Sequence, residues 1–368
     1  SNNDITTLYV DDTKVVWAGT SGGGINKFDP FRKQFYHFKD RGGAATIRAL
    51  YRDANDRVWI GSDGGGIEVS NGPIRLNEQT TFQRFAFPRR VYAMLEIENE
   101  VEHAMYLGSN VGPGMFRADL RAPSIRVQPV RGTHGSVFAM IEDRSGAIWI
   151  GNYFDGLRRW VPDPGVAGGY VKKAIGKTGE NVLPNQIIRS LQEDLAGNIW
   201  IGTGDGLAVI TAAEARKDDP QIEVYRNIPG DATSISNNYI LPICVTKEGV
   251  IWVGTFGGGI NKFIPAADGQ PARFKSYGEA DGLIDGVIKA IVEDETGKLW
   301  ISSNRGLSRF NPRTEVFENF DVNDGLQGDE FGELAACTQA DGSFIFGGVN
   351  GLTFFYPDAI KLNSRPAR

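Results

Sequence analysis

Short hydrophobic segments recur along the chain at a nearly constant interval, and each has the length and composition of a β-strand. The clearest phrase places an aromatic residue between aliphatic neighbours and ends in glycine and a small polar residue, as in Ile199–Thr203 and Ile251–Thr255. Self-similarity of this kind is typical of a repeat architecture. Eight copies lie 42 to 52 residues apart and are anchored at Trp17, Trp59, Tyr106, Trp149, Trp200, Trp252, Trp300 and Ile345.

Each copy contains four short segments that are joined by turns. A β-rich segment such as 137–142 comes first, followed by a turn that often contains Asp and Gly, and then by the aromatic segment. A glycine-rich turn leads to a third segment, and the fourth carries an aromatic pair such as Phe274 and Tyr277. Four strands in about 47 residues form the unit of a β-propeller, and no segment shows a sustained helical period.

The repeats predict an all-β fold, a single β-propeller of four-stranded antiparallel blades that covers residues 1–360. Eight blades are favoured and seven are the alternative, because the eighth copy ends near residue 356 without an outer strand. The chain begins directly on a first strand, so no segment is expected to replace the missing one. Residues 361–368 are interpreted as the start of a linker to a following domain.

The first segment of each copy has a constrained position and a variable one. Two residues after its leading aliphatic residue stands a small residue in nearly every copy, for example Ala49, Ala139 and Ala290. Close packing of the innermost strands near the axis of a propeller requires such residues. The residue between them varies freely, as expected near the mouth of a central channel: Thr6, Arg48, Tyr92, Phe138, Arg189, Leu241 and Lys289.

Composition and charge narrow the function classes. Glycine contributes 47 of 368 residues, against a usual share of about 7%, which indicates many tight turns. The net charge is −6 and the basic residues are scattered, so nucleic-acid binding is not expected. Two cysteines exclude a disulfide scaffold, and three distant histidines lack metal-ligand spacing, so neither a metal nor a cofactor is expected. No apolar run approaches the roughly 18 residues of a membrane span.

The repeat resembles the two-component regulator propeller repeat of bacterial hybrid two-component proteins. The resemblance rests on Ile199–Thr203 followed by Gly206 and Leu207, on residues 252–263, and on the link between blades at 229–238. Residues 323–358 are similar to the last blade before the β-sandwich stalk of such proteins. Members of the family sense a small extracellular ligand, often a glycan fragment. They signal through a membrane helix to a histidine kinase or, in some members, to a diguanylate cyclase.

The resemblance implies a periplasmic ligand-sensing domain of an inner-membrane signalling protein. Its ligand would be an oligosaccharide or another small molecule, and the full-length receptor would be a homodimer. The domain itself would not be an enzyme, and any contact with a membrane would be made by flanking segments.

Two altered turns and one ring of positions are the candidate ligand site. The fourth copy replaces its small turn residues with Tyr153, Phe154 and Asp155, where aromatic faces could stack on sugars and a carboxylate could bind hydroxyls. The turn of the seventh copy, with Asn304 and Arg305, also departs from the pattern. The alternative is that these turns only pack against a neighbour. Residues expected to ring the channel mouth, where the cations would suit an acidic sugar, are Arg48, Tyr92, Arg189, Tyr239 and Lys289, although each could be a solvated rim residue.

Two other functions remain open. A propeller lyase or hydrolase would need a general base, and His134, close to a first strand, is the only plausible one. Carboxylate pairs such as Glu142 and Asp143 recur at one repeat phase, which indicates a role in turns rather than in catalysis, where a group occurs once. A protein-interaction scaffold would be indicated by a large exposed apolar patch.

Overall fold

The computed structural model describes residues 4–12, 15–28, 35–38, 46–63, 66–75, 80–85, 87, 90–99, 102–110, 112–122, 124–166, 169–177 and 181–361. In this part of the chain, eight antiparallel sheets account for nearly all regular structure. The helical elements described are the short 3-10 helices η1 (Glu279–Asp281), η2 (Val322–Asp324) and η3 (Pro357–Ala359). No helix among the described residues is long and apolar enough to cross a membrane. Apart from residue 361, the predicted linker lies outside the described residues.

The sheets follow the chain in order, and most contain four strands. The first three sheets comprise β1 (Ile5–Val10), β2 (Val16–Thr20) and β3 (Gly24–Phe28); then β5 (Ile47–Arg52), β6 (Val58–Ser62), β7 (Ile67–Ser70) and β8 (Phe82–Phe85); then β9 (Val91–Glu98), β10 (His103–Ser109), β11 (Met115–Asp119) and β12 (Val127–Pro129). The next two comprise β13 (Val137–Glu142), β14 (Ile148–Asn152), β15 (Leu157–Pro162) and β16 (Tyr170–Ile175); then β17 (Ile188–Glu193), β18 (Ile199–Thr203), β19 (Gly206–Ile210) and β20 (Glu223–Tyr225).

The last three sheets complete the described chain. They comprise β21 (Ile240–Val245), β22 (Ile251–Thr255), β23 (Ile260–Ile264) and β24 (Arg273–Tyr277); then β25 (Ile288–Glu293), β26 (Leu299–Ser303), β27 (Leu307–Asn311) and β28 (Val316–Phe320); and finally β29 (Phe331–Thr338), β30 (Phe344–Gly348) and β31 (Gly351–Phe355) together with β4 (Tyr36–Phe38).

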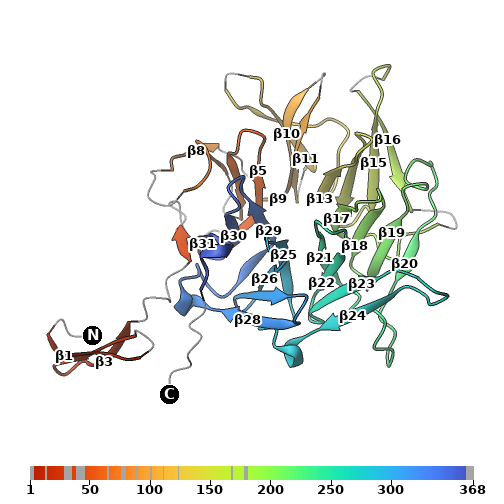
Figure 1. The fold of residues 1–368 in the computed structure, drawn as a ribbon. Helices are drawn as coiled ribbons and strands as arrows, with labels where there is room; N and C mark the ends of the chain where they lie inside the picture. Colours follow the sequence, from red (N-terminus) through yellow and green to blue (C-terminus); the bar gives the residue numbers. More distant parts are fainter. Residues whose placement is uncertain are drawn as a thin grey trace.

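Seven of the sheets form a closed ring of blades around a channel. Each inner strand contacts the inner strand of the next blade, from β5 through β9, β13, β17, β21 and β25 to β29, which returns to β5. The prediction of an all-β propeller is confirmed, and the described residues form eight repeated sheets, one of which has three strands. The sheet of β1, β2 and β3 lies beside the ring (Figure 1), and its extensive contacts in the described chain are internal. The closed ring thus has the seven blades that the sequence left as the alternative.

Strand β4 closes the ring by completing the last blade. It is the fourth segment of the first repeat, yet it pairs with β31, where Phe38 lies opposite Leu352 and Tyr36 opposite Phe354. The neighbouring Phe35 is buried, with its ring centre 4.9 Å from that of Phe355. The expectation that no segment replaces the missing outer strand is therefore wrong. Burial of aromatic side chains against the last blade decides the partner of this strand, and the ring draws on residues 35–360.

Glycine in the second strand sets the distance between neighbouring blades. A Cβ atom placed on these glycines would lie only 2.5 to 2.9 Å from the aliphatic residue that begins the next inner strand. The same contact joins the last blade to the first. The pairs are Gly61 with Val91, Gly108 with Val137, Gly151 with Ile188, Gly202 with Ile240, Gly254 with Ile288, and Gly347 with Ile47. In the separate sheet, the atoms nearest the corresponding Cβ of Gly19 belong to Thr6 and Thr7 of its own strand β1.

The recurring aspartates stabilise turns and hold the aromatic anchors. Asp194 accepts backbone hydrogen bonds from Ala196 and Asn198, and its other oxygen accepts one from Trp200 Nε1 at 2.8 Å. The same bond joins Trp59 to Asp53, Trp149 to Asp143 and Trp300 to Asp294, at 2.7 to 3.0 Å. The structural interpretation of these carboxylates is confirmed.

The contact between blades is testable by adding one methyl group. We expect Gly254→Ala to destabilise the protein by about 2 kcal/mol, because the new Cβ would lie 2.5 Å from Ile288 Cγ2 and 2.6 Å from Pro242 Cγ. The control is Gly278→Ala, where nothing lies within 4 Å of the added atom. Its free energy of unfolding should stay within about 0.5 kcal/mol of the parent protein in a urea titration. Equal effects of the two substitutions would contradict the packing role.

Candidate functional site

A β-bulge near the start of six inner strands interrupts the ladder at the position that the sequence places near the channel mouth. In β17, Ile188 pairs with Thr203 and Ser190 with Gly202, so Arg189 has no partner in the ladder. Such a bulge re-aims the side chain that it contains. The strands β5, β9, β13 and β25 carry the same irregularity, at Arg48, Tyr92, Phe138 and Lys289, and in β21 it lies between Ile240 and Ile243.

Aromatic side chains from two blades meet at this mouth. Tyr92 stacks on Phe138, with ring centres 4.1 Å apart and planes inclined by 26°. Tyr153 reaches the same cluster from the turn between β14 and β15, with its ring centre 4.9 Å from that of Phe138. Phe154 continues the row edge-to-face on Tyr153, and 75% of its surface is exposed. The aromatic side chains therefore form a continuous row from Tyr92 to the exposed Phe154.

Arg189 lies buried among these rings. Its guanidinium carbon is 5.0 Å from the ring centre of Phe138, 5.4 Å from that of Tyr153 and 5.9 Å from that of Tyr239. Contacts of this length between a cation and aromatic rings are attractive. The pKa of Tyr239 is raised to about 12, mainly because the side chain is buried. The charge of Arg189 opposes this rise, and a hydrogen bond with Tyr153 adds to it. Tyr239 therefore stays a neutral phenol at neutral pH.

A larger bulge in β29 brings a carboxylate to Arg189. Between the pairs Phe331 with Gly348 and Ala336 with Phe346, β29 advances five residues while β30 advances two. Glu333, inside this bulge, forms ion pairs with Arg189 and with Lys289, whose Nζ lies 3.5 Å from Glu333 Oε1. Strand β29 also contacts β21, although β25 lies between them in the ring. The bulge thus reaches across the channel mouth.

The structure brings together five of the ten predicted site residues and places a sixth at the edge. Tyr92, Tyr153, Arg189, Tyr239 and Lys289 join the mouth cluster, and Phe154 borders it. Phe138 was placed near the mouth but left out of the candidate site, and Glu333 was missed. The variable position of the first strand was the available signal for Phe138, whereas no repeated feature of the sequence marked Glu333.

The other four predicted residues lie outside this cluster or are held by different partners. Arg48 Nε donates to Asp63 at 3.0 Å. Asp155 forms ion pairs with Arg158 and with Lys177 Nζ, the latter at 2.5 Å. Asn304 and Arg305 stay in the turn after β26, where the Arg305 backbone N–H donates to Ser303. None of the described contacts links these four side chains to the rings around Arg189.

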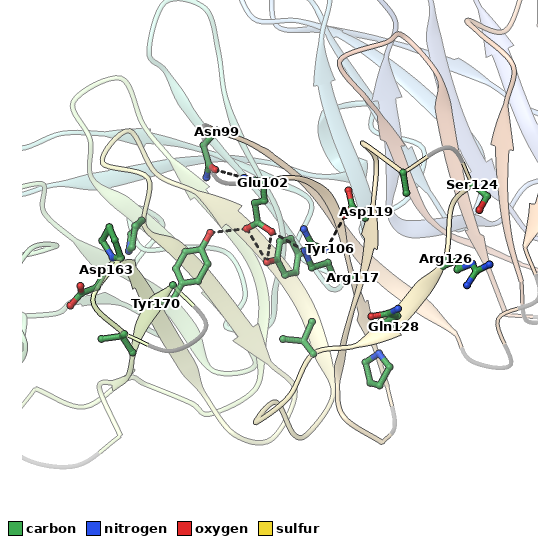
Figure 2. A pocket seen from close by; sticks show the side chains of 17 residues that line it. Asn99, Glu102, Tyr106, Arg117, Asp119, Ser124, Arg126, Gln128, Asp163 and Tyr170 are labelled. Carbon is green, nitrogen blue, oxygen red and sulfur yellow. Dashed lines mark hydrogen bonds and ion pairs between the residues drawn. The ribbon is translucent and has the colours of Figure 1, made fainter.

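A groove of about 960 Å³ runs between the outer strands of two neighbouring blades (Figure 2). At its centre, Glu102 accepts hydrogen bonds from the hydroxyls of Tyr106 and Tyr170, both at 3.0 Å, and from Arg117 Nε at 2.8 Å. The sequence had marked this copy only by its Tyr106, which stands where other copies carry tryptophan. Further lining residues are Pro129, Val130, Pro162, Pro164 and Val166.

The groove keeps its polar groups engaged with one another. Burial, together with the Glu102 charge, raises the pKa of both Tyr106 and Tyr170, so both phenols remain donors. The Glu102 carboxylate receives three hydrogen bonds, so its partners within the groove are already in place.

Catalytic and metal-binding constellations are not evident among the described residues. No group of three or more His, Cys, Asp or Glu side chains in that part of the chain could hold a metal ion. His134 is exposed in the loop before β13, and the hydrogen bonds of the described residues give its ring no carboxylate partner. His103 lies 2.7 Å from Glu96 at the far end of β9 from the channel mouth.

The family model of the two-component regulator propeller matches residues 42–64, 234–257 and 282–305. Histidine kinase P4 from Formosa agariphila is 25% identical over 233 residues, which is 62% of this chain and 16% of that protein.

Two solved structures share the fold. The extracellular domain of a putative hybrid two-component system from B. thetaiotaomicron has a TM-score of 0.73 and 23% identity, over 97% of this chain and 46% of that one. Virginiamycin B lyase from Staphylococcus aureus, a catalytically inactive variant with quinupristin, has a TM-score of 0.62 and 12% identity, over 87% and 98% of the two chains. The chain therefore spans less than half the length of the two-component proteins that it matches.

The ion pairs of Asp155 predict a stability effect that depends on pH. The hydrogen bond from Lys177 lowers the pKa of this carboxyl, and the bond from Arg158 adds to the effect. A lowered pKa in the folded state contributes stability above the pKa of the unfolded chain, about 3.9, and that stability is lost as pH falls through the folded pKa.

We therefore expect Asp155→Asn to lower the free energy of unfolding by up to about 1 kcal/mol at pH 7. The loss should be smaller at pH 3, below the ordinary pKa of the carboxyl, and should vanish only once the pH falls below the lowered pKa of the folded state. Urea titrations at the two pH values measure it, with exposed Glu248→Gln as the control. A loss that persists unchanged in acid would show that the ion pairs are not its cause.

Proposed function

The chain carries repeats of the two-component regulator propeller family, and we propose that it is the ligand-sensing part of a bacterial two-component signalling protein, exposed in the periplasm. Its ligand is an oligosaccharide or another small extracellular molecule, bound at the channel mouth. The observation that carries the proposal is the convergence of Tyr92, Phe138, Tyr153 and Arg189 from three blades at one end of the channel.

The relatives support the sensory role. One is named a histidine kinase, and another is the extracellular domain of a putative hybrid two-component system. Because this chain covers 16% and 46% of those proteins, a kinase or cyclase output, a membrane anchor and a homodimeric receptor all belong to the proposal.

The chemistry of the mouth suits a sugar. A row of aromatic faces buries the apolar face of a pyranose ring, and neighbouring polar groups orient its hydroxyls, as in other small-molecule sites. Phe154, at the exposed end of the row, extends the surface over which a longer oligosaccharide could lie. Binding transmits a signal only if the ligand has different affinities for two arrangements of the receptor.

Calorimetry with a panel of oligosaccharides tests this function. We expect saturable binding of one ligand per chain without turnover, and at least a tenfold weaker affinity after Phe138→Ala, because the stacking surface is removed. Tyr36→Ala, an exposed aromatic on β4, should leave the affinity unchanged. Cleavage of the ligand would refute a sensor, and loss of binding after Tyr170→Ala but not after Phe138→Ala would move the site to the groove.

A propeller lyase or hydrolase is the second candidate, because the fold also overlaps virginiamycin B lyase over 87% of this chain. Such an activity would use His134 as its general base. An activity that His134→Ala abolishes while the folded state remains intact would favour the enzyme over the sensor.

A further inference from the structure

We propose that Glu333 is a built-in occupant of a carboxylate site formed by Arg189 and Lys289, and that the ligand carries a carboxylate that replaces it. The inference rests on the proposed function, because it assigns the chemical class of the ligand at the same mouth. It predicts an acidic sugar rather than a neutral one.

The backbone around Glu333 departs from the pattern of the other blades. Six inner strands of the ring begin with a bulge of one extra residue, whereas β29 contains three extra residues between Phe331 and Ala336. Leu334 in this segment has a φ of 58°, in the left-handed region that a branched aliphatic residue rarely adopts. The segment therefore has a strained backbone, and the ion pairs of its neighbour Glu333 connect it to Arg189 and Lys289 on other blades.

The charges at the mouth do not balance. The side chains of Arg189 and Lys289 are 5% and 8% exposed, and the carboxylate that both of them contact is that of Glu333. Two buried cations against one carboxylate leave a net positive charge in a place where water screens it little. Arg189 Nε is also buried without a hydrogen-bond partner among the described residues. The site thus retains both charge and a donor for an incoming anion.

An exchange of carboxylates would let the ligand bind to the two cations in place of Glu333. A ligand carboxylate can accept from the guanidinium fork in the geometry that arginine prefers, so the charge pairing is preserved when Glu333 withdraws. A neutral ligand has no carboxylate to replace Glu333. Its binding would therefore break the ion pairs with Arg189 and Lys289 without forming new ones. The apparent affinity for an acid equals the intrinsic affinity multiplied by the fraction of molecules in which Glu333 has left the site. Withdrawal of the β29 segment would then report the bound state to the blades on either side.

The substitution Glu333→Gln removes the competing charge and keeps the shape of the side chain. The probes are glucuronate and glucose, which differ by a carboxylate at one carbon, measured by calorimetry at millimolar concentrations. We expect glucuronate to bind Glu333→Gln roughly tenfold or more tightly than the parent protein, with no comparable gain for glucose.

The matched control is Glu318→Gln. Glu318 pairs with Arg309 in the outer part of another blade, and the exposures of that pair, 8% and 27%, resemble the 5% and 26% of Arg189 and Glu333. This control should bind both sugars as the parent protein does. A gain for glucuronate in Glu318→Gln as well would mean that any unpaired buried arginine attracts the acid, which overturns the assignment.

Each further outcome decides the proposal. An equal gain for glucose and glucuronate would show that Glu333 blocks the mouth by its bulk, and no gain for either would show that it only stabilises the ring; both overturn the exchange.

If Glu333→Gln does not fold, Glu333→Gln combined with Lys289→Met restores the net charge of the parent site and should still gain affinity for glucuronate through Arg189. Neutral oligosaccharides that bind the parent protein while glucuronate never binds the variants would leave the sensor intact and refute the acidic ligand. A gain for glucuronate when no oligosaccharide binds the parent would refute the proposed glycan sensor and keep the carboxylate site.

Discussion

The contact that governs this fold is the one between a glycine in the second strand of a blade and the aliphatic residue that begins the next inner strand. It recurs at six junctions of the ring, where a Cβ on the glycine would come within 2.9 Å of its neighbour. At this spacing the sheets pack tightly near the axis, and the small residues of the first strand, such as Ala93 and Ala139, lie against the same glycines. The pair of Gly347 with Ile47 carries the contact from the last blade back to the first, so that the ring closes without the sheet of β1 to β3.

The same tight junction produces the candidate site. In β17, Ile188 packs against Gly151 of the preceding blade and Ser190 packs against Gly202 of its own blade. The residue between them, Arg189, lies in a bulge outside the ladder. The residue type at this position varies from blade to blade, and the position can therefore carry the chemistry of binding. Three blades supply Tyr92, Phe138 and Arg189, and the longer bulge of β29 adds the carboxylate of Glu333, which pairs with Arg189. Residues that pack the blades together and residues of the candidate site thus alternate along each inner strand.

Local sequence patterns predict the features that depend on local interactions, such as strands and turns. They do not predict which segments pair when those segments lie far apart in the sequence. The repeat phase predicted the eight sheets, the turn role of aspartates such as Asp194, and the variable position that holds Arg189. The pairing of β4 with β31 was not predictable, because it is decided by the burial of Phe35 against a blade about 300 residues away in sequence. Asp155 was expected at a ligand site for its residue type, yet its partner Lys177 comes from a different strand connection. The bulge that presents Glu333 was not predictable either, because β29 has the same length as β9.

A crystal structure of the chain grown with an acidic oligosaccharide tests the central claim most directly, because it locates the ligand and Glu333 in one experiment. The account predicts density for a sugar ring against Phe138 and Tyr153, its carboxylate on Arg189, and Glu333 withdrawn from both cations. Density confined to the groove around Glu102, with Glu333 still paired to Arg189, would contradict it.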